Sequence, residues 1–282
     1  MRFGVPLARV RPELWNDVVD AAEELGYESL WLSDHLVFPT AMAGSPHEVE
    51  AGDDAHPPVP PTTPVYEPGA LLSYLAARTE RIRLGTFVYL LAIRHPFVAA
   101  RTFATVDVLS GGRVEVGVGA GWLRSEWVAA GYDPTTRGRR LDESIEVCRR
   151  LWTEDAVSHD GEFWAWDEVA FEPKPVQSRL PVLVGGESTA ALRRAARLGD
   201  GWIGMVHRVD EAAEWTAKVR AASEEVGRTG PPVEVTMGGT VESEADLAAY
   251  ERAGVDRLIV APWRRSGDAV AALTEFAGRY SG

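Results

Sequence analysis

Short apolar runs alternate with amphipathic stretches along nearly the whole chain. Most of the runs are continuously apolar, which is typical of strands buried on both faces of a parallel sheet. They predict eight strands, at residues 2–7, 28–33, 81–90, 113–118, 181–184, 201–206, 233–238 and 257–261. The stretches between and after them repeat apolar residues at helical spacing and predict eight helices, at residues 14–25, 67–79, 97–109, 141–152, 188–198, 211–226, 244–253 and 268–280.

Eight strand–helix units in a chain of 282 residues predict an α/β fold, namely a (β/α)8 TIM barrel with inserted loops. A doubly wound open sheet is the structural alternative. Because no clean linker separates the units, we expect a single domain over residues 1–282.

Two segments interrupt the repeat. Residues 39–66 are rich in proline, glycine and aspartate and have no helical period. They follow the second predicted strand, so they should lie at the C-terminal mouth of the barrel, where a loop of this length is often a functional lid. A flexible decoration is the alternative. Residues 158–175 alternate aromatic and polar positions and predict an inserted hairpin.

An acidic composition limits the classes of partner. The formal net charge is −13, with 45% hydrophobic and 25% charged residues, which argues against nucleic acid or an anionic membrane as main partner. The sequence opens on a strand pattern without a signal peptide, and no apolar run approaches the ~18–20 residues of a membrane span. We therefore expect a soluble, cytoplasmic protein. The one cysteine, Cys148, is interpreted as a core residue.

Asp34 and His35 end the second predicted strand, where the active sites of such barrels form. Histidine is the side chain most readily tuned for proton transfer near neutral pH, and an adjacent carboxylate can orient it or contact a ligand. The structural alternative is that Asp34 caps the next segment and His35 packs. The position at a strand end favours the functional interpretation.

Alternating glycines, Gly117, Gly119 and Gly121, follow the fourth predicted strand. Their spacing is not the G-x-G-x-x-G of dinucleotide sites. Residues without side chains at a strand end let a planar or phosphorylated group approach the backbone, and dense packing of strand against helix is the alternative.

A second glycine cluster precedes a predicted helix. Gly185 and Gly186 follow the fifth strand, and Ser188 and Thr189 open the helix. Exposed backbone N–H groups and the helix dipole make such a helix start an anion site, and phosphate is the natural ligand. A plain strand-to-helix turn with a good N-cap is the alternative.

No pattern for metal or nucleophilic chemistry is present in the sequence. The six histidines never fall at His-x-x-x-His spacing, there is one cysteine, and no G-x-S-x-G motif occurs. We therefore expect neither a metal site nor a hydrolase.

Several of these motifs together resemble the bacterial luciferase-like flavin and deazaflavin oxidoreductases. The matching stretches are AEELGYESLWLSDH at 22–35, YEPGALLSYLAARTERIRLGT at 66–86, RHPFVAARTFATVDVLSGGRVEVGVGAGW at 94–122, RRLDESIEVCRRLW at 139–152 and PVLVGGESTAALRRAARLGDGWI at 181–203. The likeness covers most of residues 2–205 in the family's order and fades after them. It is closest to the branch that uses coenzyme F420.

The resemblance implies a barrel that holds an isoalloxazine or deazaflavin ring at its C-terminal mouth. It implies a non-prolyl cis peptide at Phe87-Val88 against that ring, Asp34 as a cofactor contact and His35 as the proton-transfer residue. The remaining positions that match cofactor-binding residues of the family are Ala120 and Gly121 beside the ring, and Gly185, Gly186, Ser188 and Thr189 at its phosphate.

One position departs from the sugar-phosphate dehydrogenase branch of that family. In that branch a glutamate follows the last glycine of G-x-G-x-G and acts with the histidine, whereas this chain has Trp122 there. An indole cannot take or give that proton. Sugar-phosphate oxidation is therefore not expected, and we predict an aromatic, apolar substrate pocket with Tyr89, Trp122 and Trp263 as walls.

The resemblance favours an F420-dependent oxidoreductase that transfers a hydride between the deazaflavin and an organic substrate, with His35 as proton donor or acceptor. The alternative is an FMNH2-dependent two-component monooxygenase with a separate cofactor reductase, and a third interpretation is a flavin-binding barrel without turnover. Arginines 94, 137, 139 and 140 would either serve the polyglutamate tail of F420 or pair with helix carboxylates. A homodimer is typical of the family. The substrate is left open.

Overall fold

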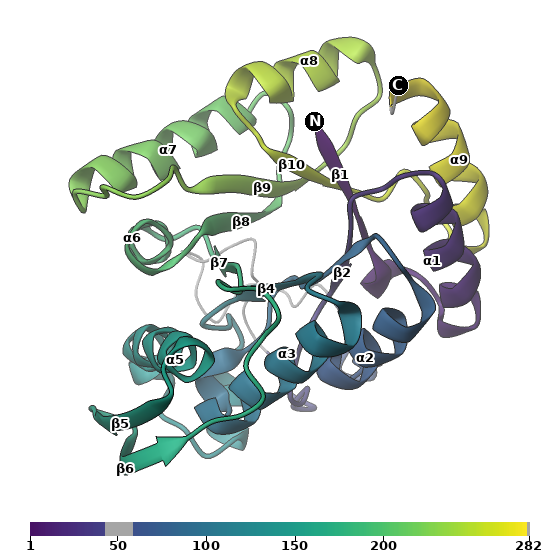
Figure 1. The fold of residues 1–282 in the computed structure, drawn as a ribbon. Helices are drawn as coiled ribbons and strands as arrows, with labels where there is room; N and C mark the ends of the chain where they lie inside the picture. Colours follow the sequence, from purple (N-terminus) through teal and green to yellow (C-terminus); the bar gives the residue numbers. More distant parts are fainter. Residues whose placement is uncertain (43–58, 281–282) are drawn as a thin grey trace.

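Eight parallel strands close into a barrel in the computed structural model of this chain, which describes residues 1–42 and 59–280 (Figure 1). Their order around the barrel is β1-β10-β9-β8-β7-β4-β3-β2. The bounds are β1 Arg2–Pro6, β2 Ser29–Leu32, β3 Arg83–Thr86, β4 Val114–Val118, β7 Val182–Gly185, β8 Gly201–Val206, β9 Glu234–Gly239 and β10 Arg257–Val260. The closed order confirms the predicted TIM barrel and excludes the open sheet.

Helices surround the barrel, and each predicted helix is present (Figure 1). The α-helices are α1 Trp15–Glu24, α2 Pro68–Arg78, α3 Pro96–Ser110, α4 Arg124–Ala129, α5 Arg137–Thr153, α6 Thr189–Leu198, α7 Ala212–Glu225, α8 Glu244–Ala253 and α9 Ala269–Tyr280. Short 3-10 turns are η1 Leu7–Arg9, η2 Pro12–Leu14, η4 Leu91–Ile93, η5 Pro134–Thr136 and η6 Ser266–Asp268. Periodicity did not predict α4, because six residues are too few to show a helical repeat.

Local sequence sets where several helices begin and end. The side chain of Glu67 accepts a hydrogen bond from Ala70 N, and Pro68 follows it at the first position of α2. Ser243 and Asp246 form a capping box at the start of α8. Gly111 ends α3 with a φ of 67°, a left-handed conformation that favours glycine.

The side chains on the barrel-facing side of the helices form the main core. Cys148 of α5 is buried there, as predicted, and its burial raises the pKa of the thiol to about 12. Within residues 1–42 and 59–280, no helix combines the length and the apolar character that crossing a membrane requires.

A two-stranded antiparallel hairpin stands outside the barrel beside α5 (Figure 1). Its strands are β5 Ala156–Asp160 and β6 Ala165–Ala170, which confirms the hairpin predicted at residues 158–175. Glu143 of α5 fixes it, because its carboxylate accepts hydrogen bonds from Phe163 N and Trp164 N and lies 3.0 Å from His159 Nε2.

Trp31 of β2 fills the interior of the barrel. It packs with Leu183, Ile203 and Ile259, and Phe87 and Val88 lie against this cluster. A Cβ on Gly4 or on Gly85 would come within 2.5 or 2.4 Å of the Trp31 ring, so glycine at these positions makes room for the indole. Because protein interiors pack with few voids, this cluster fills the barrel below its C-terminal end, so no channel runs through it.

A network of charged side chains closes the opposite, N-terminal end of the barrel. The fully buried guanidinium of Arg257 lies 2.7 Å from Glu28, 2.8 Å from Glu115 and 3.0 Å from Glu234. Arg83 pairs with Glu115, and Arg2 lies 3.0 Å from Glu234. Three carboxylates thus face three guanidiniums, which satisfies the rule that buried charges are paired.

Candidate active site

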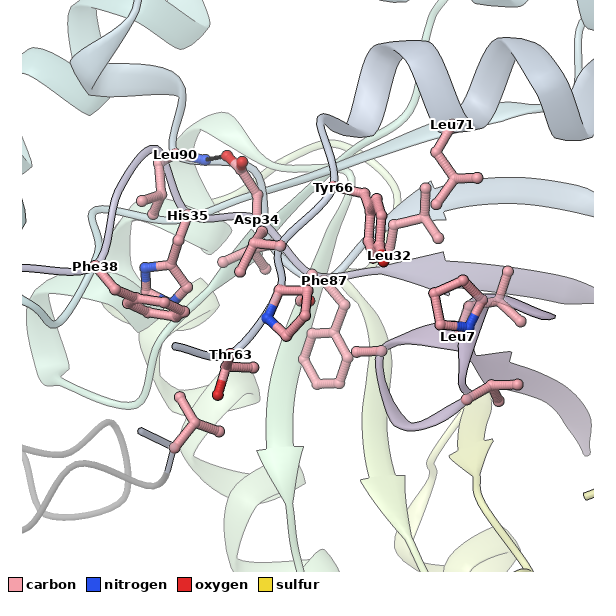
Figure 2. A pocket seen from close by; sticks show the side chains of 18 of the residues that line it. Leu7, Leu32, Asp34, His35, Phe38, Thr63, Tyr66, Leu71, Phe87 and Leu90 are labelled. Carbon is pink, nitrogen blue, oxygen red and sulfur yellow. Dashed lines mark hydrogen bonds between the residues drawn. The ribbon is translucent and has the colours of Figure 1, made fainter. Parts of the chain in front are cut away.

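A cavity of about 620 Å³ opens at the C-terminal ends of the strands. Its wall is built by the ends of β2, β3 and β4, by Met205 near the end of β8, by the segment after β1 and by residues 59–66. Figure 2 shows His35 beside Phe38 on one side of this space, Leu7 on the other, and Phe87 between them. A volume of this size is within the range of small-molecule and cofactor sites.

His35 is held by a buried carboxylate from another element. Its Nδ1 lies 2.8 Å from Oε2 of Glu126, which belongs to α4 and is 0% exposed. The second carboxylate oxygen, Oε1, accepts hydrogen bonds from Leu36 N at 2.5 Å and Val37 N at 3.2 Å. An ionised carboxylate accepts from Nδ1–H, so Nε2 is the ring atom left for exchange; none of the described residues bonds to it.

Sequence reasoning missed Glu126. Leu123, Glu126 and Trp127 lie at helical spacing, but three positions are too few to establish a period, and their burial is seen only in the structure. A glutamate on the apolar face of a helix is rare unless it is paired. No motif named the partner, since His35 lies 91 residues away in the chain.

Asp34 contributes to the cavity wall, but other protein groups already occupy its carboxylate. Its two oxygens accept from the guanidinium of Arg94 at 2.7 and 2.8 Å, and one of them also accepts from Leu90 N at 2.8 Å (the dashed line in Figure 2). Burial raises the pKa of the Asp34 carboxyl, and the charge of Arg94 opposes that rise. Asp34 therefore ties the end of β2 to the segment that follows β3 and fixes the position of His35 next to it.

The peptide bond between Phe87 and Val88 is cis, as the resemblance implied, and both residues line the cavity. The neighbouring glycines make room for this segment. A Cβ on Gly117 would meet the backbone oxygen of Thr86 at 1.9 Å, and one on Gly119 would meet Val88 at 2.5 Å. For these two glycines the packing interpretation holds.

Residues 120–122 turn at the end of β4 and place two groups at the cavity. Gly121 has a φ of 73° and lines the cavity, while the carbonyl of Ala120 accepts from Trp127 Nε1 at 3.0 Å. Ala120 itself does not line it. Trp122 does, and its ring stands edge-on to His35 with centroids 5.8 Å apart. The indole thus puts an apolar wall beside the imidazole.

The predicted phosphate loop lies at the adjacent end of β7. Gly185 is buried, whereas Gly186, Ser188 and Thr189 are exposed at the N-terminus of α6. Gly186 has a φ of 111°, and the Ser188 hydroxyl accepts from Ala191 N as the N-cap. None of these residues lines the cavity, but β7 pairs with β8, whose Met205 does. An anion at the helix start and a ring in the cavity would therefore occupy neighbouring strand ends.

Glu187, between these residues, turns its charge away from the helix start. Its Oε1 accepts from Met205 N at 3.1 Å and lies 2.7 Å from His207 Nε2. The rings of His207, Trp202 and Trp215 contact one another, with centroids 4.8 to 6.3 Å apart. Through its contacts with Met205 and His207, the Glu187 carboxylate links the segment after β7 to the end of β8.

Two predicted substrate walls lie elsewhere. Tyr89 is 1% exposed and packs edge-on against Phe103 of α3, with the guanidinium of Arg94 4.2 Å above its ring. Trp263 is 6% exposed and packs into the main core after β10. Neither residue lines this cavity: Trp263 belongs to the main core and Tyr89 lines a second cavity, of about 800 Å³, beside α2 and α3, whereas Trp122 lines the first.

The loop predicted as a lid contributes to the cavity as far as it is described. Val59, Thr63, Pro64, Val65 and Tyr66 line the space, and Tyr66 packs edge-on against Trp15 at 4.7 Å. The part of the prediction at residues 43–58 lies outside the described residues.

The arginines considered for a cofactor tail have partners within the chain. Arg94 pairs with Asp34, and Arg139 pairs with Glu162 at 2.9 Å. Arg137 donates to Pro134 O, and Arg140 donates to Ala92 O and lies over aromatic rings of the hairpin. The arginines are thus engaged within the chain, but neither carboxylate belongs to a helix, so the predicted alternative of pairing with helix carboxylates is wrong. Among the described residues, no group of three or more His, Cys, Asp or Glu could hold a metal ion.

Comparison with known proteins identifies relatives over almost the whole chain. A family model described as luciferase-like monooxygenase matches residues 9–280. A Mycobacterium tuberculosis protein, named only as uncharacterized, is 36% identical over 264 residues, covering 90% of this chain and 89% of that protein. An F420-dependent glucose-6-phosphate dehydrogenase of Microbacterium testaceum is 32% identical, covering 82% of this chain and 65% of that protein.

Solved structures share the fold at lower sequence identity. An F420-dependent secondary alcohol dehydrogenase in complex with an F420–acetone adduct superposes with a TM-score of 0.79, at 18% identity, over 99% of this chain and 98% of that one. The FMN complex of the oxygenating component of 3,6-diketocamphane monooxygenase from Pseudomonas putida superposes with a TM-score of 0.64, at 17% identity, over 85% of this chain and 67% of that one.

Proposed function

Because this chain belongs to the luciferase-like monooxygenase family and is thus an oxidoreductase, we propose that it is an F420-dependent enzyme acting on an organic substrate. The hydride would pass between the deazaflavin and the substrate. The names of the 32–33% identical relatives, F420-dependent glucose-6-phosphate dehydrogenases, support the cofactor. The observation that carries the reaction type is the His35–Glu126 pair at a cavity walled by Phe87 and Val88.

The residues at the mouth fit a tricyclic ring with a phosphate-bearing chain. Phe87, Val88 and Gly121 offer a flat, apolar surface, and the exposed N-terminus of α6 offers backbone N–H groups to an anion. When bound, the deazaflavin supplies a carbon that carries a hydride. The residues expected to hold it are Phe87, Val88 and Gly121 beside the ring and Gly185, Gly186, Ser188 and Thr189 at the phosphate, with Asp34 positioning the wall.

His35 would hold and move the substrate proton at Nε2. Glu126 accepts from Nδ1–H, which fixes the ring orientation and leaves the opposite nitrogen toward the cavity. The carboxylate has no arginine or lysine partner among the described residues, so its contacts are the imidazole and two backbone N–H groups. Phe38 and Trp122 flank the ring and keep water from it.

An FMNH2-dependent two-component monooxygenase, with a separate reductase, is the second candidate. The structural neighbour with FMN supports it, because one barrel architecture serves both chemistries. A flavin-binding barrel without turnover is the third. A protein of this third kind would have no use for a buried carboxylate that orients a histidine.

Titration of the purified chain with F420 and with FMN, followed by cofactor fluorescence, separates these candidates. We expect micromolar binding of F420, and binding of FMN with none of F420 would reject the proposal. His35→Ala should keep F420 affinity and lower the rate of F420H2 oxidation by about 10²–10⁴-fold in a screen of ketones. His159→Ala, on the hairpin, is the matched control and should keep that rate; equal rates for both variants would remove His35 from the reaction.

A homodimer is proposed through the outer faces of α2 and α3. Tyr74 of α2 and Val98, Val108 and Leu109 of α3 are exposed, and exposed large apolar side chains gathered on neighbouring helices are a feature of association sites. We also propose that residues 1–282 act as one domain, since the family match and the closed barrel span both halves of the chain. Light scattering coupled to gel filtration measures the mass; a monomer at micromolar concentration would reject the dimer.

A further inference from the structure

We propose that the substrate of this site is an uncharged, mainly apolar molecule with a single oxygen function, rather than a sugar phosphate or a carboxylate. The inference deepens the proposed function and rests on it for the reaction. The binding preference rests on the described lining other than Phe87, Val88 and Gly121, which the ring is expected to cover, so it is measured with bound cofactor as well as without it.

The walls of the cavity are aliphatic and aromatic from several elements. Side chains from the segment after β1, from the ends of β2 and β3 and from residues 59–66 face it, among them Leu7, Val10, Trp15, Phe38, Tyr66 and Phe87 (partly drawn in Figure 2). The indole N–H of Trp15 is already bonded to Val10 O at 3.0 Å. A hydroxyl-rich molecule would lose its hydrogen bonds to water here and replace only a few of them, whereas an apolar one gains from burial.

The described lining offers no cation to an anionic substrate inside the cavity. Besides the imidazole of His35, its ionisable acidic and basic side chains are Arg11 and Asp34. Asp34 is saturated by Arg94 and Leu90 N. Arg11 is 63% exposed at the rim and lies 3.3 Å from Glu13, which neutralises it. A phosphate or carboxylate would therefore enter without a counter-charge, at a large desolvation cost.

One polar atom is aimed at the reacting group. His35 lies between Phe38, at a centroid distance of 4.4 Å, and Trp122, at 5.8 Å, and its Nε2 has no bond to the described residues. The other polar lining side chains are neutral hydroxyls, those of Ser33, Thr63, Tyr66 and Ser266. A carbonyl or hydroxyl oxygen at Nε2 with hydrocarbon on both sides satisfies this arrangement, since specificity comes from few well-placed polar groups in an apolar pocket.

Calorimetric titration with a matched set of ligands tests the preference. The probes are 4-phenylcyclohexanone, the same ketone carrying a carboxylate on its phenyl ring, and glucose 6-phosphate. We expect the neutral ketone to bind at least about ten-fold more tightly than its carboxylate, and glucose 6-phosphate not to bind. Equal or tighter binding of either anion, or no binding of the neutral ketone at millimolar concentration, overturns the proposal.

Two variants show that the preference arises in this cavity. Phe38→Arg puts a cation beside His35 and should reduce or invert the ratio of ketone to carboxylate affinity. Val176→Arg adds the same charge at a 59% exposed position outside the cavity and should leave the ratio unchanged. If the two variants shift it equally, the cavity does not set the preference. F420 binding by the same protein is measured separately. If the protein does not bind F420 but keeps the ligand preference, the proposed function is rejected. If it binds F420 but shows no ligand preference, only the proposed substrate class is rejected.

Discussion

His35 and Glu126 are 91 residues apart in the chain, yet their side chains meet at 2.8 Å. The carboxylate also accepts two backbone N–H groups from the segment that follows His35, so it holds the ring and its loop together. This arrangement, a buried carboxylate on Nδ1 with Nε2 toward the reactants, orients a general acid or base wherever it occurs. At the residue scale, Glu126 is therefore a positioning residue.

Glu126→Gln tests that role. The glutamine can keep the bonds to Leu36 N and Val37 N, but it then presents an amide N–H₂ to Nδ1, which favours the tautomer with the proton on Nε2. We expect kcat to fall by about 10–100-fold with little change in KM. Nitrogen-15 spectra of the labelled imidazole should show the change of tautomer at His35.

Glu143→Gln is the matched control, because Glu143 and His159 form a similar pair at 3.0 Å on the hairpin. It should leave both kcat and the His35 signal unchanged. An unaltered His35 spectrum in Glu126→Gln would show that the carboxylate does not set the tautomer.

The ends of β3 and β4 show how backbone packing shapes the mouth. Thr86 O and Val88 press against the glycine positions 117, 119 and 185, and a side chain at any of them would collide with this segment. At the element scale, these glycines leave the space that the cis Phe87-Val88 segment occupies, and the residues of that segment line the cavity. Gly121, with its positive φ, belongs to the cavity itself.

Gly117→Ala should therefore destabilise the protein. The new Cβ would lie 1.9 Å from a backbone oxygen, so the strand must move, and we expect a loss of about 3 kcal/mol in the free energy of unfolding. Gly278→Ala is the control, because this helical glycine of α9 has no atom within 4 Å of its added Cβ. It should stabilise slightly, by up to ~1 kcal/mol. Thermal unfolding compares the two; similar melting temperatures would contradict the packing account.

At the scale of the whole molecule, the two ends of the barrel differ. The N-terminal end is filled by a network of paired charges, and the C-terminal end carries the cavity. Arg257, Arg83 and Arg2 interleave with Glu28, Glu115 and Glu234 at the N-terminal ends of six strands. Burial alone would raise the pKa of Glu28, but hydrogen bonds and charge from Arg257 lower it below its ordinary 4.5. A lowered carboxyl pKa stabilises the fold above the unfolded value and is lost as the pH falls through the folded value.

We therefore expect the free energy of unfolding to fall as the pH drops below about 4.5, with Arg257→Met moving acid unfolding to higher pH. At neutral pH, Arg257→Met should cost about 3–5 kcal/mol, since it leaves three clustered carboxylates with only Arg2 and Arg83 to balance their charge. Arg279→Met removes only an exposed pair with Glu275 and should change stability by less than ~1 kcal/mol. Urea unfolding at two pH values measures both; equal stabilities of the variants would contradict a structural role for the network.

Periodicity and local chemistry in the sequence determined most of the architecture. Strands buried on both faces must be continuously apolar, and helices that cover them must be amphipathic, so the eight units and the hairpin could be read before any contact was known. Strand ends also located Asp34, His35 and the glycine loops, because a parallel barrel gathers these ends at one face.

Only the tertiary structure decided which side chains meet. Glu126 carries no motif of its own, and its role depends on α4 lying beside the end of β2. Tyr89 and Trp263 match a pocket wall by composition, but the direction of each side chain turns them into the core. Asp34 matches a cofactor contact of the family by position, but in the structure both of its carboxylate oxygens accept hydrogen bonds from Arg94. Spacing along the chain fixes which face a residue occupies within its own element, whereas partners across elements depend on packing that no local pattern encodes.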